Sequence, residues 1–295
     1  MSFDAIILGG SYAGLSAGLQ LARARRKVLI IDNGLRRNRF AETSHGFLTQ
    51  DGNTPSAIAA EGRAQLMEYP TVQWLQDEAT SAEPLKDGFK IALRHGADIT
   101  GRRLVLATGV TDVLPELEGL AERWGKSVFH CPYCHGYELE EGAIGVLATS
   151  ALSMHHALML PDWGPTTFFL NGAFEPDADQ LQQLARRNVT VERGTIDRLE
   201  GERANVVMKD GRVLPMSGLF TATRTEVAAP FAEQLGCAFD DGPLGRSIRT
   251  DAMKATTVHG VFACGDAARS AGSVALAVGD GAMAGAATHR SLMFD

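Results

Sequence analysis

The sequence lacks the features of a secreted, membrane-spanning or nucleic-acid-binding protein. It has no run of about 18 apolar residues that could cross a bilayer, and no basic leader precedes the apolar segment that begins at Phe3. Its 28 Lys and Arg are outnumbered by 35 Asp and Glu, and the formal net charge of −7 provides no attraction to nucleic acid or anionic lipid. We therefore expect a cytoplasmic protein with no nucleic-acid or membrane partner.

Cysteine is also scarce, with four residues in a chain of 295, and this excludes a scaffold held together by disulfides. Cys237 and Cys264 lie far apart in the sequence, and we expect both to be packing residues. Cys131 and Cys134, in contrast, are separated only by Pro-Tyr. So close a pair in a chain without a leader is expected to be catalytic, redox-sensing or metal-binding.

What the sequence has in quantity is apolar residues, at 45%, and glycine, at 32 residues, several of which follow apolar runs. This combination is typical of nucleotide-binding α/β proteins, and 295 residues suit two domains better than one. A first strand–helix–strand unit is predicted over residues 3–32 and a second over 143–171. Residues 110–119 between them are typical of a domain crossover, and the pattern changes again near Gly242.

We therefore predict an α/β fold with two Rossmann-like three-layer domains, one inserted into the other. The outer domain comprises residues 1–113 and 242–295, and the inserted domain comprises residues 114–241. The patterns predict strands over 3–8, 27–32, 89–94, 102–109, 143–148, 166–171, 190–194 and 204–208, and helices over 15–26, 55–69 and 273–293, with a further helix from about residue 151.

The turn after the first predicted strand carries a dinucleotide-binding fingerprint. Gly9 would permit the tight turn, Gly14 would allow close helix–strand packing, and the helix N-terminus would stabilise a pyrophosphate. Asp32, at the end of the next strand, would accept the hydroxyls of a ribose. Ser11 stands where the pattern has its second glycine, so an ordinary strand–turn–helix junction without a ligand is the alternative.

Four interpretations of the pair Cys131–Cys134 are open. Two thiols at this spacing can cycle between dithiol and disulfide, and the flanking His130 and His135 can exchange protons with them near neutral pH. A zinc site would need more ligands, and haem attachment, whose pattern the run CPYCH formally matches, normally requires export. An inert buried pair is the fourth interpretation. We adopt redox catalysis.

Three segments together resemble the flavoprotein pyridine nucleotide–disulfide oxidoreductases, in particular the small thioredoxin reductases. They are LGGSYAGLSAG (8–18), LVLATG (104–109) and GVFACGDAA (260–268), and the resemblance covers essentially the whole chain. It implies FAD as the cofactor of the outer domain, an inserted domain of the NAD(P)H-binding type, and a homodimer. The residues that it implies for FAD binding are Gly9, Ser11, Ala13, Gly14, Asp32, Arg39, His45, Thr108, Gly109, Gly265, Asp266, Ser273 and Val274.

The same resemblance assigns a different role to each of the two cysteines. The small thioredoxin reductases carry C-x-x-C-D-G at the start of their central domain, and Cys131-x-x-Cys134-His135-Gly136 occupies this place. Carried over, Cys134 would lie against the flavin, and Cys131 would attack or release the substrate. His135 replaces the acidic proton donor of the family and could act as a base for an incoming dithiol, with His130 as a second candidate.

A second dinucleotide site is not recognisable in the inserted domain. After the strand over 143–148, the three positions for small residues are occupied by Ala148, Ser150 and Ser153, and a Cβ at the first two would crowd a pyrophosphate. After the strand over 166–171, NADP would need an arginine for its 2′-phosphate, but the chain reads Asn-Gly-Ala-Phe. We therefore expect that NADPH is not the physiological partner.

A retained FAD site, a retained cysteine pair with flanking histidines and a degraded NADPH site together resemble the dithiol oxidases of gliotoxin, holomycin and romidepsin biosynthesis. The favoured hypothesis is that a small-molecule dithiol or a small thiol protein is oxidised, with oxygen as the electron acceptor. The alternatives are a thioredoxin-reductase-like enzyme reduced by NADPH or ferredoxin, and a flavin-bound redox sensor without turnover. No metal site is expected. Structural or surface roles are expected for His155 and His156, and core packing, rather than a substrate cleft, for Tyr133, Tyr137 and Trp163.

Overall fold

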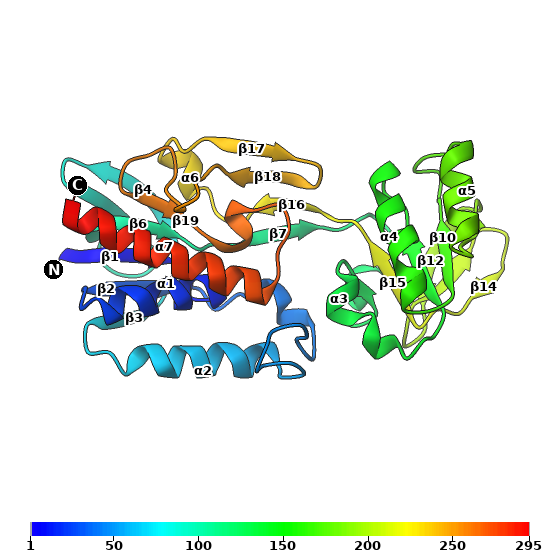
Figure 1. Cartoon of the computed structure of the whole chain (residues 1–295), viewed down its shortest axis with the longest axis horizontal. Helices are drawn as coiled ribbons and strands as arrows, with labels where there is room; N and C mark the ends of the chain where they lie inside the picture. The colour runs from blue at the N-terminus through cyan, green and yellow to red at the C-terminus, as the bar shows by residue number, and fades with distance from the viewer. Residues whose placement is uncertain (1, 295) are drawn as a thin grey trace.

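The computed structural model describes residues 2–294, which form two α/β bodies joined by a pair of neighbouring strands (Figure 1). The first body contains the first and last elements of the chain, and the middle of the chain forms the second body (Figure 1). The α/β fold class, with one Rossmann-like body inserted into another, is confirmed.

The first body is built on a mixed sheet with a parallel centre. Its strand order is β3-β2-β1-β6-β5-β4, and β19 pairs with the second half of β6. The central strands are almost entirely buried, as expected for parallel strands covered on both faces. The strands of the whole sheet are β1 (Ser2–Leu8), β2 (Val28–Asp32), β3 (Val72–Gln76), β4 (Ala79–Leu85), β5 (Gly88–Leu93), β6 (Ile99–Leu106) and β19 (Val261–Ala263).

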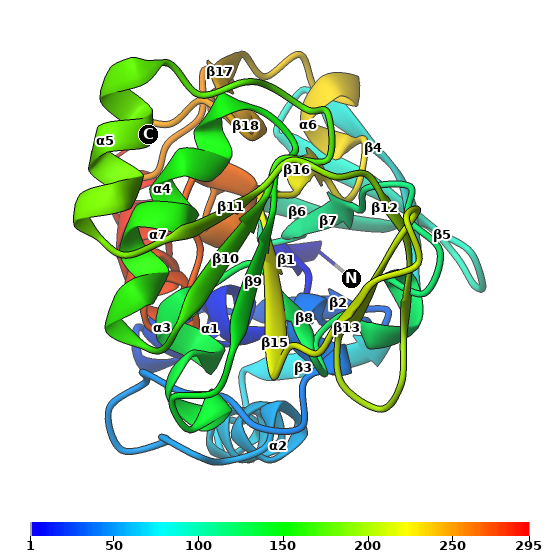
Figure 2. The same ribbon diagram turned by 90° about the vertical axis from the view of Figure 1, so that its right-hand side faces the viewer.

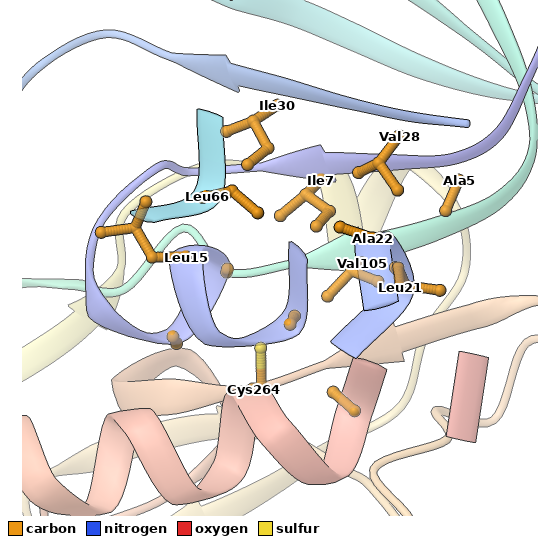
Figure 3. Close-up of a cluster of buried hydrophobic side chains, with 14 of the residues drawn as sticks. Ala5, Ile7, Leu15, Leu21, Ala22, Val28, Ile30, Leu66, Val105 and Cys264 are labelled. Carbon is orange, nitrogen blue, oxygen red and sulfur yellow. The ribbon is translucent and has the colours of Figure 1, made fainter. Parts of the chain in front are cut away.

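Three helices cover one face of this sheet: α1 (Tyr12–Arg23), α2 (Pro55–Met67) and α7 (Val274–Phe294). Figure 3 shows the core between helices and sheet, where Ile7 and Ile30 of the sheet meet Leu66 of α2 and Cys264 lies among the buried side chains. The other face of the sheet forms a second core, which contains apolar residues of β5 and of the segment that follows the second body. That segment contains α6 (Phe231–Gln234), β17 (Phe239–Gly242) and β18 (Gly245–Ile248). Elsewhere in the first body, η1 (Arg37–Phe40) and η6 (Gly265–Ala268) are short 3₁₀ turns.

The second body also has three layers. A parallel sheet of order β11-β10-β9-β15-β8 packs against helices on one face and against an antiparallel sheet, β12-β13-β14, on the other (Figure 2). Its strands are β8 (Val128–Phe129), β9 (Ile144–Leu147), β10 (Thr166–Phe169), β11 (Thr190–Glu192), β12 (Ile196–Glu200), β13 (Asn205–Met208), β14 (Val213–Leu214) and β15 (Gly218–Thr221). Its helices are α3 (Pro132–His135), α4 (Met154–Met159) and α5 (Ala178–Arg186), with 3₁₀ turns η2 (Ala121–Arg123), η3 (Tyr137–Leu139), η4 (Ala151–Ser153) and η5 (Leu160–Asp162).

The chain crosses between the bodies on β7 (Val110–Val113) and β16 (Arg224–Val227), which pair with each other in antiparallel fashion. After β16, Phe231 is buried in the core of the first body, and the backbone N–H of Ala82 donates to the side chain of Gln234. We therefore propose that the return crossing lies at β16, before the predicted boundary at residue 242.

Two helices differ from the sequence prediction for local reasons. α1 begins at Tyr12 rather than at residue 15, and it ends at Arg23 because Arg25 adopts a φ of 58°, through which a right-handed helix cannot continue. The apolar pattern does not predict α5, which begins with a capping box. There the Asp177 carboxylate accepts from the N–H of Gln180, and the Gln180 side chain accepts from the N–H of Asp177.

α1 and α7 approach each other closely because small residues line their contact. A Cβ at Gly281 would overlap the carbonyl oxygen of Ala13, and a Cβ at Gly285 would overlap the carbonyl oxygen of Ala17. The contact therefore requires glycine at these two positions for steric reasons, since a packed interior has no room for an added methyl group.

We expect Gly281→Ala to destabilise the first body, because the added methyl group must push α7 away from α1. Overpacking of this kind should lower the free energy of unfolding by about 1–3 kcal/mol, measured by urea denaturation followed by circular dichroism. Gly279→Ala on the same helix is the matched control. Its Cβ would meet no atom within 4 Å among the residues described, so the gain in helix propensity should stabilise by about 0.5–1 kcal/mol. Equal effects of the two substitutions would contradict the packing argument.

Candidate active site

A cavity of about 600 Å³ lies between the two bodies. Its walls come from the turn after β1, the segment around η1, both crossing segments, the start of α7 and the disulfide-bearing α3. Among the described residues that line the cavity, Gly14 is absent. A Cβ at Gly14 would overlap the carbonyl oxygen of Gly9, so this glycine serves helix–strand packing. The other residues implied for cofactor binding all line the cavity: Gly9, Ser11, Ala13, Asp32, Arg39, His45, Thr108, Gly109, Gly265, Asp266, Ser273 and Val274.

The N-terminus of α1 opens into this cavity. Ser11 has φ −87° and ψ −164°, an extended conformation that any residue can adopt, so serine replaces the expected glycine without backbone strain. In the part of the chain that the structure describes, its side chain makes no capping hydrogen bond, and the first turn carries no acidic residue. The N–H groups of this turn are therefore available to an anion. Asp32 is oriented by the N–H of Gly10, which donates to its Oδ1 at 3.0 Å.

Arg37 joins three parts of the cavity wall that lie far apart in the sequence. Its Nε and Nη2 donate to the two carboxylate oxygens of Asp112 at 2.9 and 2.6 Å, and its Nη1 donates to Asp266 at 2.8 Å. The hydroxyl of Thr223, just before the return crossing, donates to the same Asp112. Burial works against both ions, yet their hydrogen bonds raise the pKa of Arg37 and lower the pKa of Asp112.

Sequence reasoning does not identify Arg37 or Asp112 as site residues. The two residues are 75 positions apart, and Arg37 and Asp266 are 229 positions apart, so no local motif marks the contact. An arginine in a short basic cluster has the sequence signature of a solvated surface. Only the folded chain brings the two carboxylates to it.

Cys131 and Cys134 form a disulfide at the start of α3, with their Cα atoms 5.3 Å apart. Cys131 is the N-cap residue, and Pro132 takes the first helical position, where a missing N–H costs nothing. Cys134 lines the cavity, whereas Cys131, half-buried, is outside the lining formed by residues 2–294. The pair therefore presents one sulfur to the cavity and the other to its outer side.

His135 lines the cavity next to Cys134. Its ring stacks on that of Phe129, with centroids 4.3 Å apart and planes inclined by 20°. Burial, together with the nearby His45, lowers the pKa of His135 to about 4. The ring is therefore neutral at physiological pH and can accept a proton.

His130, the second predicted base, also lines the cavity. Its ring lies against Trp124, with centroids 5.9 Å apart. Burial, together with the charge of Arg37, lowers the pKa of His130 to about 4. His156 lies behind it, and burial, together with the neighbouring His155, lowers its pKa to about 4 as well. The cavity wall thus carries two imidazoles that are neutral at physiological pH, those of His130 and His135.

His45 connects a loop of the first body to the second body at the rim of the cavity. Its Nδ1 lies 3.4 Å from a carboxylate oxygen of Glu138 in η3 and 3.6 Å from Asp51 in its own loop. Its Nε2 lies 3.0 Å from the hydroxyl of Thr43. The loop is therefore held against the segment that carries the cysteines.

Tyr133 and Tyr137 are not core residues, and this corrects the sequence prediction. Their exposed fractions are 73% and 85%. The short helical segment that carries them buries Pro132, Gly136 and Leu139, so the two tyrosines face outward. Trp163 is partly buried and packs against the core of the second body, as predicted, and His155 is exposed.

The turn after β9 is closed where the equivalent turn after β1 is open. The N–H of Leu152 donates to Ser150 at 3.3 Å, and the N–H of Thr149 donates to Ser153 at 3.0 Å. The Thr149 hydroxyl donates in turn to the carbonyl of Ala222 at 3.1 Å. Two of the backbone donors in this turn, the N–H groups of Thr149 and Leu152, are therefore occupied by the chain's own side chains.

The remaining candidates give no second reactive site. Within residues 2–294, no three His, Cys, Asp or Glu side chains converge as a metal site would require. None of the described helices is both long and apolar enough to cross a membrane. Cys237 and Cys264 are buried in the two cores of the first body. Burial raises the pKa of both thiols, that of Cys264 to about 12, so both stay protonated and unreactive.

The family model described as pyridine nucleotide-disulphide oxidoreductase matches residues 3–281. The chain is 32% identical over 309 residues to thioredoxin reductase sirT of Leptosphaeria maculans, covering 97% of this chain and 93% of that protein. It is 30% identical over 306 residues to thioredoxin reductase tcpT of Claviceps purpurea, covering 99% and 95%. The predicted resemblance to the thioredoxin reductases is confirmed.

Solved structures give the same result for the fold. An oxidoreductase from Agrobacterium tumefaciens is 58% identical, with a TM-score of 0.97 and coverage of 100% of this chain and 99% of that one. The crystal structure of HlmI is 35% identical, with a TM-score of 0.89 and coverage of 99% and 93%. Both bodies therefore have counterparts in these relatives.

We expect the free energy of unfolding to fall as the pH decreases from 6.5 to 4. Burial lowers the pKa of His130, His135 and His156 from 6.5 to about 4 in the folded chain, so the unfolded chain binds more protons across this window. The stabilisation is complete above pH 6.5 and is lost towards pH 4. Urea denaturation at a series of pH values measures the slope.

His156→Gln should reduce this slope, because a neutral amide takes no proton in either state. His259→Gln is the control, since its ring is exposed to solvent in the folded chain. A slope that is the same in the parent chain and in His156→Gln would contradict the account of buried neutral imidazoles.

Proposed function

The chain belongs to the pyridine nucleotide-disulphide oxidoreductase family, and from this premise we propose that it is an FAD-dependent dithiol oxidase with oxygen as the electron acceptor. One observation carries the proposal: the Cys131–Cys134 disulfide presents Cys134 to the cavity between the two bodies, while Ser150 and Ser153 accept from backbone donors of the second dinucleotide turn. This arrangement supports electron transfer from thiols and disfavours a nicotinamide donor, whose pyrophosphate would have to displace these two serine hydrogen bonds.

The cavity fits FAD at both of its ends. At the first end, the open N-terminus of α1 can receive a pyrophosphate, and Asp32 can accept ribose hydroxyls. Cys134 and His135 also line the cavity, so a flavin ring bound near them would lie beside the disulfide. A volume of about 600 Å³ is typical of cofactor sites. Asp266, already held by Arg37, is the further residue that we propose for FAD binding.

The proposed reaction begins at Cys131. A substrate thiolate attacks the Cys131 sulfur, the bond to Cys134 breaks, and Cys134 leaves as a thiolate. The second substrate thiol attacks the mixed disulfide, so the substrate leaves as a disulfide and Cys131 becomes a thiol. Two electrons and one proton have then passed from the substrate to the enzyme, which holds Cys131 as a thiol and Cys134 as a thiolate. FAD bound in the cavity would supply the two-electron acceptor for this thiol pair, so that the disulfide could form again, with oxygen as the final acceptor and hydrogen peroxide as the product.

His135 is the residue that we propose as the proton acceptor. Its neutral ring can take a proton from the second substrate thiol or exchange one with the Cys134 thiolate. A pKa of about 4 makes it a weak base in the disulfide state. A thiolate beside the ring favours its charged form, so the appearance of the Cys134 thiolate strengthens it as a base. His130 is a second candidate for the same step.

Two further expectations from the sequence remain part of the proposal. The enzyme is cytoplasmic, where thiol substrates are kept reduced, and it is a homodimer. An NADPH-dependent or ferredoxin-dependent reductase and a redox sensor are the competing functions that the next experiment separates.

Under anaerobic conditions, we expect dithiothreitol to bleach the flavin absorbance of the holoenzyme. Admission of air should restore the absorbance and produce hydrogen peroxide over many cycles. NADPH at the same concentration should bleach the flavin far more slowly, because Ser150 and Ser153 already accept from two backbone donors of the turn after β9. Rapid bleaching by NADPH would establish a reductase, and bleaching without repeated turnover would establish a sensor.

Cys131→Ser should lower the rate of dithiol oxidation by about a thousandfold or more, because the sulfur that accepts the substrate is removed. Cys134→Ser should have the same effect on turnover. Cys237→Ala is the matched control, since this buried thiol lies away from the cavity. Oxygen consumption measures all three variants, and normal activity of Cys131→Ser would exclude the proposed mechanism.

A further inference from the structure

Two exposed tyrosines flank the redox pair on a single helical face. α3 and η3 follow each other through Gly136, which keeps right-handed helical angles of φ −71° and ψ −37°. Tyr133 and Tyr137 are four positions apart, so they lie on the same side of this segment. Aromatic side chains exposed to 73% and 85% bury little area against the protein itself. Exposed aromatic pairs of this kind mark surfaces that bind something else.

Contact with Trp163 fixes the orientation of the Tyr133 ring. Its ring meets the edge of Trp163, with centroids 5.3 Å apart and planes at 86°. Trp163 can approach because Gly136 has no side chain: a Cβ there would come within 2.7 Å of the indole. Tyr133 lies between Cys131 and Cys134 in the sequence, and Cys131 is the sulfur outside the cavity. The aromatic face therefore adjoins the sulfur that the substrate attacks.

The segment that carries this face is rich in acidic residues, two of which, Asp162 and Glu175, are paired with Arg187 and Arg193. From residue 127 to residue 185 the chain contains no Lys or Arg, and it contains seven acidic residues: Glu138, Glu140, Glu141, Asp162, Glu175, Asp177 and Asp179. Three of these, Glu138, Glu140 and Glu141, directly follow the aromatic pair and are exposed. A solute that carries negative charge is repelled from such a surface.

We propose that Tyr133 and Tyr137 bind the apolar body of the substrate, and that the acidic stretch selects against anions. The substrate is then a small apolar dithiol that is neutral or cationic. Acidic thiol proteins and carboxylate-bearing dithiols such as dihydrolipoate are poor substrates. This inference rests on the proposed function only in taking Cys131 as the sulfur that meets the substrate.

The surface can be tested without flavin turnover in a Cys134→Ser chain, whose Cys131 is a free thiol. Its thiolate displaces one thiolate from an aromatic disulfide and keeps the other half as a mixed disulfide. The probes are neutral 4,4′-dithiodipyridine and dianionic 5,5′-dithiobis(2-nitrobenzoate), and the released chromophore gives the rate. The Cys131→Ser, Cys134→Ser double variant corrects for the two buried thiols.

We expect Tyr133→Ala with Tyr137→Ala to slow the neutral probe by about three- to tenfold, as the loss of aromatic contacts would. The matched Tyr→Phe pair should keep the parent rate. Glu140→Gln and Glu141→Gln together should accelerate the anionic probe and leave the neutral probe unchanged. Glu202→Gln, exposed in the turn between β12 and β13, is the charge control and should change neither rate.

The inference is overturned if neither set of substitutions changes the ratio of the two probe rates. It is also overturned if the wild-type holoenzyme oxidises dihydrolipoate or an acidic thioredoxin with a higher kcat/KM than benzene-1,2-dimethanethiol. If the probes discriminate as expected but no dithiol reduces the flavin, the dithiol oxidase function fails while the selectivity of the surface stands.

Discussion

The pairing of β7 with β16 is the constraint on which the site depends. The chain leaves the first body on one of these strands and returns on the other, in a register that pairs Val110 with Val227. Two paired crossings hold the second body more firmly than a single flexible linker could. Arg37 adds a bidentate contact to Asp112 on one crossing, and Thr223 joins the same carboxylate just before the other. Cys134 reaches the cavity only because the second body is held in this orientation.

The molecule contains the same strand–turn–helix architecture twice, with opposite outcomes. After β1, an extended Ser11 leaves the first turn of α1 open to a ligand. After β9, Ser150 and Ser153 turn inward and take the backbone donors themselves. Serine is thus compatible with a ligand site in one turn and closes the other. The difference lies in which partner its hydroxyl finds, and a count of glycines alone does not reveal it.

The sequence predicts the parts of this structure that are determined locally. The buried runs of β1 and β2, the glycine turn between them and the cysteine pair are all visible as patterns of neighbouring residues. Contacts between distant segments are not visible: Arg37 meets Asp266 across 229 positions. Tyr133 and Tyr137 show a second kind of limit. An aromatic residue in a globular chain is usually expected in a core, but a helical segment of only two turns has one inner side, and Pro132 and Leu139 occupy it.

The distribution of charge gives the molecule a polarity that its net charge conceals. Of the 35 Asp and Glu, seven lie between residues 127 and 185, which leaves 28 to balance the 28 Lys and Arg of the rest of the chain. By this count the formal charge of −7 belongs to residues 127–185, although Arg187 and Arg193 of the following segment pair with Asp162 and Glu175. Such a field extends over about 8 Å at physiological ionic strength, so charged solutes are sorted before they touch the protein. Added salt weakens that sorting while leaving aromatic contacts intact, and the choice of substrate then depends on the ionic composition of the surrounding medium.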